Sequence, residues 1–347
     1  MSARDITRHN LLVRVARLYY LCHLNHREIA AREGLSRIKV TRLLQEAERE
    51  AIIEFRISDP MIGTLELEER IQKTFGLHRA VIAPTPRADD DLYDVLGRFA
   101  ADFLSRVLRE DFVIGISWGR TLNGMLPYLE RPGFRRLHVV SLSGGLAANR
   151  RQPNPYDIAS SVAERLGASA HYPLIPAIVE APATRRLLMR EQRMKPILKL
   201  WQSLDIVLVS VGVIGPETGL YYSFPDPKAE AARVRALGAV GDILARPFDI
   251  KGRPVDAGFN DRMVAVDPAD LRRAATVVGI AGGQQKIQPV LGALRTGQLT
   301  TLITDERTAE RVLALAEKSG EDMAEARIVR KLKASSSQRH ISRRSRA

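Results

Sequence analysis

From residue 65 onward, short apolar runs rich in β-branched residues alternate with segments of helical periodicity. Uniformly apolar strands separated by helices are typical of a mainly parallel sheet that helices cover on both faces. The predicted strands are 79–83, 112–116, 137–142, 206–211, 263–266, 276–280 and 299–303. The predicted helices are 92–108, 157–166, 186–204, 228–237, 284–295 and 307–317. The pattern predicts an α/β domain over residues 65–320.

The composition is that of an ordinary folded protein and excludes several classes. Of the 347 residues, 45% are hydrophobic and 27% are charged, which argues against general disorder. The single cysteine, Cys22, excludes an internal disulfide framework and a multi-thiolate zinc site. Arg14 and Arg17 interrupt the apolar residues near the N-terminus, and no run of about 18 apolar residues occurs. We therefore expect a cytoplasmic protein without a membrane span, a metal or a cofactor.

The net charge of +13 is concentrated at the two ends of the chain. Residues 1–57 hold 11 Lys and Arg against 7 Asp and Glu, residues 58–326 hold 34 against 33, and residues 327–347 hold 8 against none. A basic excess is typical of proteins with a polyanionic partner. The end of the chain, 321–347, has too little apolar surface to fold, so we expect disorder there. It is either a dispensable solvated extension or an additional contact to DNA phosphates.

The first 57 residues have the pattern of a helix-turn-helix. Apolar residues form a helical stripe between 12 and 24, and Asn25 is the expected N-cap of a second helix that ends at Glu33. Gly34 suits the turn, and Ser36 suits the N-cap of a third helix. A small residue, Ala30, stands where the two helices would cross. The predicted inner face of the third helix consists of Val40, Leu43, Leu44 and Ala47.

The predicted outer face of the third helix carries the candidate DNA-binding residues. Arg side chains bind guanine bidentately in the major groove, and Thr or Ile methyl groups contact the thymine methyl. The candidates for base edges are Ser36, Arg37, Ile38, Thr41 and Arg42, and those for phosphates are Lys39, Arg49 and Arg32. Residues 52–57 alternate like a short strand and predict a small wing. The alternative is a three-helix packing module with solvated charges, which explains fewer of these features. A metal site at 22–26 is also disfavoured, because it would lack a fourth ligand.

A linker, 58–64, separates this region from the α/β domain, and Thr64 is a candidate N-cap for the next helix. Four glycine-containing loops, 117–121, 141–145, 211–216 and 281–286, follow predicted strands. Ligands of parallel sheets bind at the carboxyl ends of the strands. Small residues let backbone amides approach an anion, so the four loops together predict a phosphate or polyol pocket. Lys286 lies in the first turn of a predicted helix, where the helix dipole alone disfavours a cation. An anionic ligand would explain a lysine at this position.

Residues 238–252 are a further candidate wall of this pocket. Asp242 could accept hydrogen bonds from sugar hydroxyl groups, and Arg246 could pair with an anion. The alternatives are a helix or turn cap for Asp242 and a surface ion pair for Arg246. Residues 249–252 are most simply a hairpin turn.

Several motifs of the chain match those of a known family in the same order. They are 16–20 (ARLYY), 28–30 (EIA), 35–37 (LSR), 40–44 (VTRLL), 115–121 (GISWGRT), 163–167 (AERLG), 238–242 (GAVGD), 281–283 (AGG) and 304–309 (TDERTA). Over residues from about 12 to 318, the chain resembles the SorC family of bacterial sugar-responsive transcriptional regulators. The resemblance implies an effector domain similar in fold to sugar-phosphate isomerases and glucosamine-phosphate deaminases. It also implies a homotetramer whose affinity for operator DNA changes when a phosphorylated sugar binds.

The resemblance also implies roles for individual residues. Ser117, Gly119 and Thr121, with Lys286, would hold the phosphate. Gly144, Gly145 and Asp242 would border the sugar, whereas Ser36, Arg37, Thr41 and Arg42 would face operator bases. The complete predicted effector-binding set is Ser117, Gly119, Arg120, Thr121, Gly144, Gly145, Asp242, Arg246 and Lys286, and the DNA-binding set is Ser36, Arg37, Ile38, Lys39, Thr41 and Arg42. The chain departs from the family at His26, which is usually Gln, at 51–52, which is usually Gly followed by Ile or Leu, and in its basic end.

Three functions remain open at this point. The first is an effector-controlled DNA-binding regulator of a carbohydrate or polyol operon, with no catalytic residue. The second is a sugar-phosphate isomerase or deaminase, which would need an acid and a base in the pocket. No histidine lies in the four glycine loops, which disfavours this enzyme. The third is a constitutive DNA-binding oligomer without an effector. The residues identify neither the sugar nor the operator.

Overall fold

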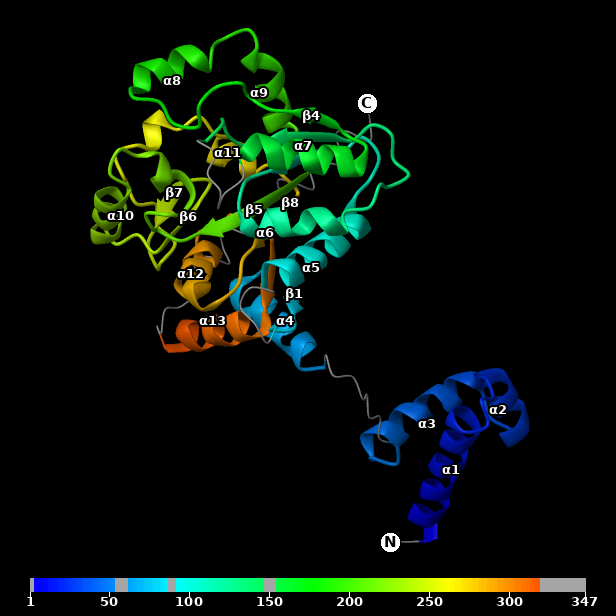
Figure 1. The fold of residues 1–347 in the computed structure, drawn as a ribbon. Helices are drawn as coiled ribbons and strands as arrows, with labels where there is room; N and C mark the ends of the chain where they lie inside the picture. Colours follow the sequence, from blue (N-terminus) through cyan, green and yellow to red (C-terminus); the bar gives the residue numbers. More distant parts are fainter. Residues whose placement is uncertain (1–2, 54–61, 87–91, 147–153, 319–347) are drawn as a thin grey trace. The chain divides into compact units, whose positions relative to one another are not determined.

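The computed structural model describes residues 3–53, 62–86, 92–146 and 154–318 (Figure 1). The chain divides into two compact units, Met1–Ile62 and Gly63–Ala347. Most of the predicted wing and linker, and all of the predicted basic extension at 321–347, lie outside the described residues. No helix within the described ranges is long and apolar enough to cross a membrane.

The first unit is a bundle of three helices with its own hydrophobic core. The helices are α1 (Ala3–Tyr20), α2 (His26–Glu33) and α3 (Arg37–Arg49). The fully or nearly buried residues are Leu12, Val15, Ala16, Leu18, Ile29, Ala30, Val40, Leu43, Leu44 and Ala47. The inner face predicted for the third helix is thus confirmed. The first helix starts earlier and ends earlier than the predicted stripe at 12–24.

The start of α2 and the turn between α2 and α3 are set by local hydrogen bonds. Asn25 Oδ1 accepts from the backbone amides of Arg27 and Glu28 at 3.0 and 3.1 Å, and the Glu28 carboxylate accepts from the Asn25 amide at 2.9 Å. This capping box satisfies amides that lack a partner within the helix. Gly34 ends α2 with a φ of 66°, which a residue with a side chain rarely adopts, and Ser36 Oγ accepts from the Lys39 amide at 3.2 Å. Both predicted N-caps and the predicted turn are confirmed.

The second unit is built on a mainly parallel sheet. Seven strands lie in the order β1-β9-β8-β5-β2-β3-β4 and all pair in parallel, whereas β6 and β7 form an antiparallel hairpin attached to β5. The strands are β1 (Arg79–Ala83), β2 (Val113–Ile116), β3 (His138–Ser141), β4 (Ser169–His171), β5 (Ile206–Gly212), β6 (Gly241–Ile243), β7 (Arg246–Phe248), β8 (Thr276–Ile280) and β9 (Thr301–Asp305). The buried strands confirm the predicted fold class.

Helices connect these strands and pack on the sheet. They are α4 (Ile62–Phe75), α5 (Leu92–Val107), α6 (Arg120–Met125), α7 (Pro155–Leu166), α8 (Pro182–Leu188), α9 (Met194–Gln202), α10 (Pro227–Ala236), α11 (Pro268–Leu271), α12 (Ile287–Arg295) and α13 (Glu306–Lys318). Helix α5 packs against α6 and the strands β1 and β9, whereas α12 packs against α13 and the strands β5 and β6 (Figure 1). One continuous core of buried residues joins the helices to the sheet. The predicted likeness to sugar-phosphate isomerases stays a prediction.

Three sequence predictions for this unit were wrong: a strand, a long helix and an N-cap. Residues 263–266 form no strand but make isolated bridges to Ser143 and Ile178. The helix predicted at 186–204 is interrupted between α8 and α9, because Pro196 is tolerated in the first turn of α9 but not inside a longer helix. Helix α4 begins before Thr64, which is therefore not its N-cap.

Three short strands were not predicted. Strands β4, β6 and β7 have three residues each, too few to show a periodic pattern. The hairpin turn predicted at 249–252 is present: the Gly252 amide donates to the Asp249 carbonyl at 2.9 Å, and Phe248 bridges Pro254 in antiparallel fashion.

Candidate functional site

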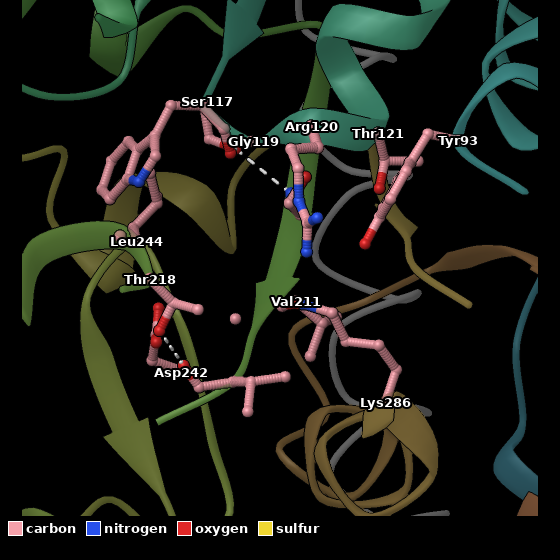
Figure 2. A pocket seen from close by; sticks show the side chains of 15 residues that line it. Tyr93, Ser117, Gly119, Arg120, Thr121, Val211, Thr218, Asp242, Leu244 and Lys286 are labelled. Carbon is pink, nitrogen blue, oxygen red and sulfur yellow. Dashed lines mark hydrogen bonds between the residues drawn. The ribbon is translucent and has the colours of Figure 1, made fainter. Parts of the chain in front are cut away.

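An open pocket of about 610 Å³ lies at the carboxyl ends of β2 and β5 (Figure 2). Its walls come from the loop after β2, the end of β5, the β6–β7 hairpin and the residue before α12. The lining residues are Tyr93, Ser117, Trp118, Gly119, Arg120, Thr121, Ser210, Val211, Gly212, Val213, Thr218, Gly219, Asp242, Leu244 and Lys286.

The pocket brings together six of the nine residues predicted to bind the effector. These six are Ser117, Gly119, Arg120, Thr121, Asp242 and Lys286. They come from segments that are up to about half the chain apart and that the parallel sheet places at one edge. In Figure 2, Arg120, Thr121 and Tyr93 gather on one side of the hollow, and Asp242 and Lys286 lie on the other.

The loop after β2 is held tightly against the end of β5. Ser117 Oγ accepts a hydrogen bond from the Ser210 amide at 3.2 Å, and the Ser117 amide donates to the Leu208 carbonyl at 3.0 Å. Gly119 has a φ of 143°, and a Cβ at this position would lie 2.5 Å from Ser210 Oγ. Glycine is thus required here both by the backbone angle and by the close approach of the two strands. The first amides of α6 have no acceptor within that helix and adjoin the pocket.

Asp242 is the carboxylate of the pocket. It belongs to β6, which pairs with β5, and its side chain packs so closely on Gly212 that a Cβ there would overlap the carboxylate. Asp242 Oδ1 also accepts from the Ala245 amide at 3.1 Å. Burial raises the pKa of Asp242 to about 6, although the charge of Lys286 opposes this shift. The group is therefore ionised at neutral pH but close to its titration range.

Lys286 is the cation that complements Asp242. It ends the short 3₁₀ helix η5 (Gln284–Lys286), and its Nζ donates to the backbone carbonyl of Val211. Burial lowers the pKa of Lys286 to about 8; Asp242 raises it and Arg120 lowers it further. A partly dehydrated ammonium group of this kind is a strong potential partner for an anion.

Arg120 supplies a second positive charge at the pocket. Its guanidinium lies over the ring of Tyr93, 4.5 Å from the ring centroid, in a cation–π contact. The sequence predicted Arg120 but missed Tyr93, Thr218 and Leu244, which reach the pocket from α5, the loop after β5 and the β6–β7 turn. No local signal marks these residues, because only tertiary packing brings them to this edge of the sheet.

The other three predicted residues do not line the pocket. The Gly144 amide donates to the Val264 carbonyl and the Gly145 amide to the Ile175 carbonyl, each at 2.9 Å. The loop 141–145 is thereby paired with two other segments. The expectation that four loops form one pocket was therefore wrong: only the loops 117–121, 211–216 and 281–286 contribute lining residues.

Arg246 lies on the opposite face of the β6–β7 hairpin from Asp242. It is paired with Ile243, and adjacent residues of a strand point to opposite faces. Its Nη1 is buried and has no hydrogen-bond partner among the described residues. Burial lowers the pKa of Arg246 to about 10, with Arg185 contributing and Asp267 opposing.

Asp305, which the sequence did not single out, holds the loop that carries Lys286. This carboxylate is 1% exposed and accepts from the amides of Gly283 and Thr308 at 2.9 and 3.1 Å. The Lys286 amide in turn donates to the Gly283 carbonyl at 2.8 Å. Asp305 thus fixes the backbone from which Lys286 enters the pocket. It belongs to the 304–309 motif, which was the available signal.

Helix α3 of the first unit exposes the predicted DNA-binding residues. Ser36, Arg37, Ile38, Lys39, Thr41 and Arg42 are all exposed. Two arginines of α1 are used differently, because Arg8 pairs with Glu46 and Arg14 with Glu33. Neither Arg37 nor Arg42 pairs with a carboxylate in the described part of the chain. Both side chains are exposed on the outer side of α3.

The comparison with known families decides the classification. A family model for a sugar-binding domain matches residues 59–314. The chain belongs to the SorC family of sugar-binding transcriptional regulators. The sorbitol operon regulator of Klebsiella pneumoniae is 30% identical to this chain over 306 residues, which cover 87% of this chain and 97% of the relative.

A further relative and a solved structure agree. The erythritol catabolism regulatory protein EryD of Brucella abortus is 28% identical over 308 residues, which cover 88% of this chain and 96% of EryD. The crystal structure of full-length SorC from Klebsiella pneumoniae superposes with a TM-score of 0.67 at 29% identity, over 88% of this chain and 98% of SorC. The match extends over nearly the whole SorC structure and confirms the predicted fold class. In the described ranges, no cluster of three or more His, Cys, Asp or Glu could hold a metal ion.

Proposed function

We propose that this SorC-family protein is a DNA-binding regulator of a carbohydrate or polyol catabolic operon, controlled by a phosphorylated sugar or polyol. The observation that carries the proposal is the pocket in which two cations, Lys286 and Arg120, accompany one carboxylate, Asp242. Cations suit a phosphate group, and a carboxylate suits the hydroxyl groups of a sugar. The names of the relatives, which regulate sorbitol and erythritol operons or catabolism, support the same class of ligand.

The roles of the pocket residues follow from their chemistry. Lys286, Arg120 and the loop from Ser117 to Thr121 would hold the phosphate, and Asp242 would accept hydrogen bonds from hydroxyl groups. Trp118, which is 8% exposed and lines the pocket, would pack against the apolar side of the ligand. Helix α3 would enter the major groove of an operator through Arg37 and Arg42.

Control of DNA binding requires that the effector distinguish two states of the protein. An effector changes operator affinity only by its differential affinity for those states, and the coupling is reciprocal. We propose a homotetramer as the operator-binding form, since an oligomer with two-fold symmetry can read two half-sites at once. Light scattering of the purified protein with and without operator tests this assembly.

We propose that the pocket binds its ligand without turning it over. At neutral pH, pKa values of about 6 for Asp242 and about 8 for Lys286 would also suit a general base and a general acid, respectively. An isomerase is therefore the second candidate. Incubation of the best ligand with the protein in deuterated water separates the two. We expect no change in its proton spectrum; incorporation of deuterium at carbon, or a new sugar, would establish the isomerase instead.

The proposal is tested with matched pairs of sugars and polyols, each with and without a phosphate. We expect one phosphorylated member to raise the unfolding temperature and to change binding to upstream DNA, while its unphosphorylated partner does neither. The protein has two tryptophans, and Trp201 is buried with its Nε1 bonded to the Ser141 carbonyl at 2.9 Å. A fluorescence change upon binding should therefore disappear in Trp118→Phe. DNA binding that no phosphorylated ligand alters would favour a constitutive DNA-binding protein.

The affinity for a phosphorylated ligand should depend on pH through Lys286. A bound phosphate stabilises the charged form of Lys286 and raises its pKa above the value of about 8 in the empty pocket. Affinity should then be full below that value and fall by up to about tenfold per pH unit above it. The conservative variant Lys286→Arg stays charged and should lack this decline. Ligand titrations on both sides of this pKa measure the effect; a flat profile for the unmodified protein would contradict the assignment.

A further inference from the structure

The outer face of α3 contains an apolar strip between two arginines. Ile38 is 69% exposed and does not belong to the described core of its unit. A single exposed isoleucine is unremarkable on a protein surface. Its position is informative, however, because Val40, Leu43 and Leu44 fix which side of α3 faces inward, and Ile38 points away from that side.

Thr41 extends this strip by its methyl group. Its Oγ1 donates a hydrogen bond to the Arg37 carbonyl, one turn back in the helix, at 3.2 Å. The hydroxyl hydrogen is thus used within the helix, so the side chain offers a partner its γ-methyl group and an oxygen that can only accept. Residues three apart are neighbours on a helix surface, so Ile38 and Thr41 present adjacent methyl groups.

The chemistry of the major groove assigns a partner to such a strip. Each base pair presents donors and acceptors there, but thymine alone among the four bases presents a methyl group, on C5. Arg37 and Arg42, which flank the strip, are suited to guanine or to phosphate instead. We infer that Ile38 and Thr41 contact the 5-methyl groups of thymines in each operator half-site, an inference that rests on the proposed DNA-binding function. The thymine methyl groups then determine sequence preference beside the arginine contacts.

The operator sequence needed for the test comes from selection of random DNA duplexes on the full-length protein. Each thymidine of the selected duplex is then replaced singly by deoxyuridine, which keeps the base pair and removes only the methyl group. We expect one or two positions per half-site at which this replacement weakens binding about fourfold, the effect of one buried methyl group. Elsewhere the replacement should have little effect.

Variants of the strip connect those positions to the two side chains. Ile38→Ala should bind the thymidine and deoxyuridine duplexes equally at its position. Thr41→Ser, which keeps the hydroxyl and removes the methyl group, should lose discrimination at the neighbouring position, whereas Thr41→Val should retain it. Gln45→Ala, at an exposed residue one turn further along α3, should discriminate as the unmodified protein does. Because these side chains are exposed, we expect unchanged unfolding temperatures for all four variants.

The possible failures are distinguishable. If no sequence is selected, the proposed DNA-binding function itself is overturned, and the inference with it. If a sequence is selected but no deoxyuridine replacement weakens binding, the regulator function stands and the thymine contact is overturned. The inference is also overturned if Ile38→Ala and Thr41→Ser both discriminate as strongly as the unmodified protein.

Discussion

Replacing Lys286 by methionine is expected to weaken binding of the phosphorylated effector roughly 13- to 160-fold while leaving operator binding intact. The ammonium group lies in the pocket beside Asp242 and Arg120 and donates to the Val211 carbonyl. Loss of a hydrogen bond to a charged group costs about 1.5–3 kcal/mol, which corresponds to this factor. Titration of the unmodified and variant proteins with the same ligand, followed by Trp118 fluorescence, measures the change.

The same substitution has two opposing effects on the stability of the empty protein. Because burial lowers the pKa of Lys286 to about 8, the folded state holds this proton less tightly than the unfolded chain. The charge therefore opposes folding below that pH, and the opposition is relieved as the pH rises through it. Lys286→Met removes this penalty but leaves the Asp242 carboxylate and the Val211 carbonyl without their partner, so we expect only a small change in unfolding temperature at neutral pH. The exposed Lys195→Met serves as the control and should bind effector normally; a normal effector titration of Lys286→Met would remove Lys286 from the site.

Replacing Arg42 by alanine is expected to weaken operator binding strongly and to reduce the preference for the operator over unrelated DNA. One bidentate contact to guanine contributes about 1–3 kcal/mol of discrimination. An oligomer that reads two half-sites loses this contribution twice, so we expect a loss of roughly 30-fold to more than 1,000-fold in operator affinity. Arg42 is exposed on α3 and is not paired with a carboxylate in the described ranges, so the fold and the oligomer should persist.

Arg49→Ala distinguishes base contact from simple attraction of charge. Arg49 is exposed at the end of the same helix, where phosphate contact is expected. Its loss should weaken operator and unrelated DNA alike, with a shallower salt dependence. Arg42→Ala should weaken the operator selectively. Equal weakening of both DNAs by Arg42→Ala would assign this arginine to phosphates and leave base recognition to other residues.

Elements with strong local signals were predictable from the sequence. The N-caps Asn25 and Ser36 and the turn at Gly34 each depend on hydrogen bonds and backbone angles within four residues. The long apolar strands likewise carry their pattern in consecutive residues. The three-residue strands and the break between α8 and α9 have too few residues to show a periodic pattern in the sequence. The segment 263–266 was predicted as a strand because it is apolar, but its bridges run to Ser143 and Ile178.

The pocket was predictable in part. Ser117, Gly119 and Thr121 follow a strand directly, so a rule about strand ends located them. Predicting Asp242 and Lys286 required the further assumption that their segments lie at the same edge of the sheet. The pairing of β5 with β6 and β8 brings them there. Gly144 and Gly145 have the same local signature as Gly119, yet their amides are engaged by the carbonyls of Val264 and Ile175.

The sequence alone determined the three helices of the first unit, the parallel α/β class of the second and the charged residues available to DNA and to a ligand, because helix caps, periodicity and side-chain chemistry are local. Tertiary structure alone decided which glycine loops meet, which face of the β6–β7 hairpin carries Asp242 and which Arg246, and how far burial moves the pKa values of Asp242 and Lys286. These properties depend on strand order and desolvation, which arise from contacts between residues far apart in the chain.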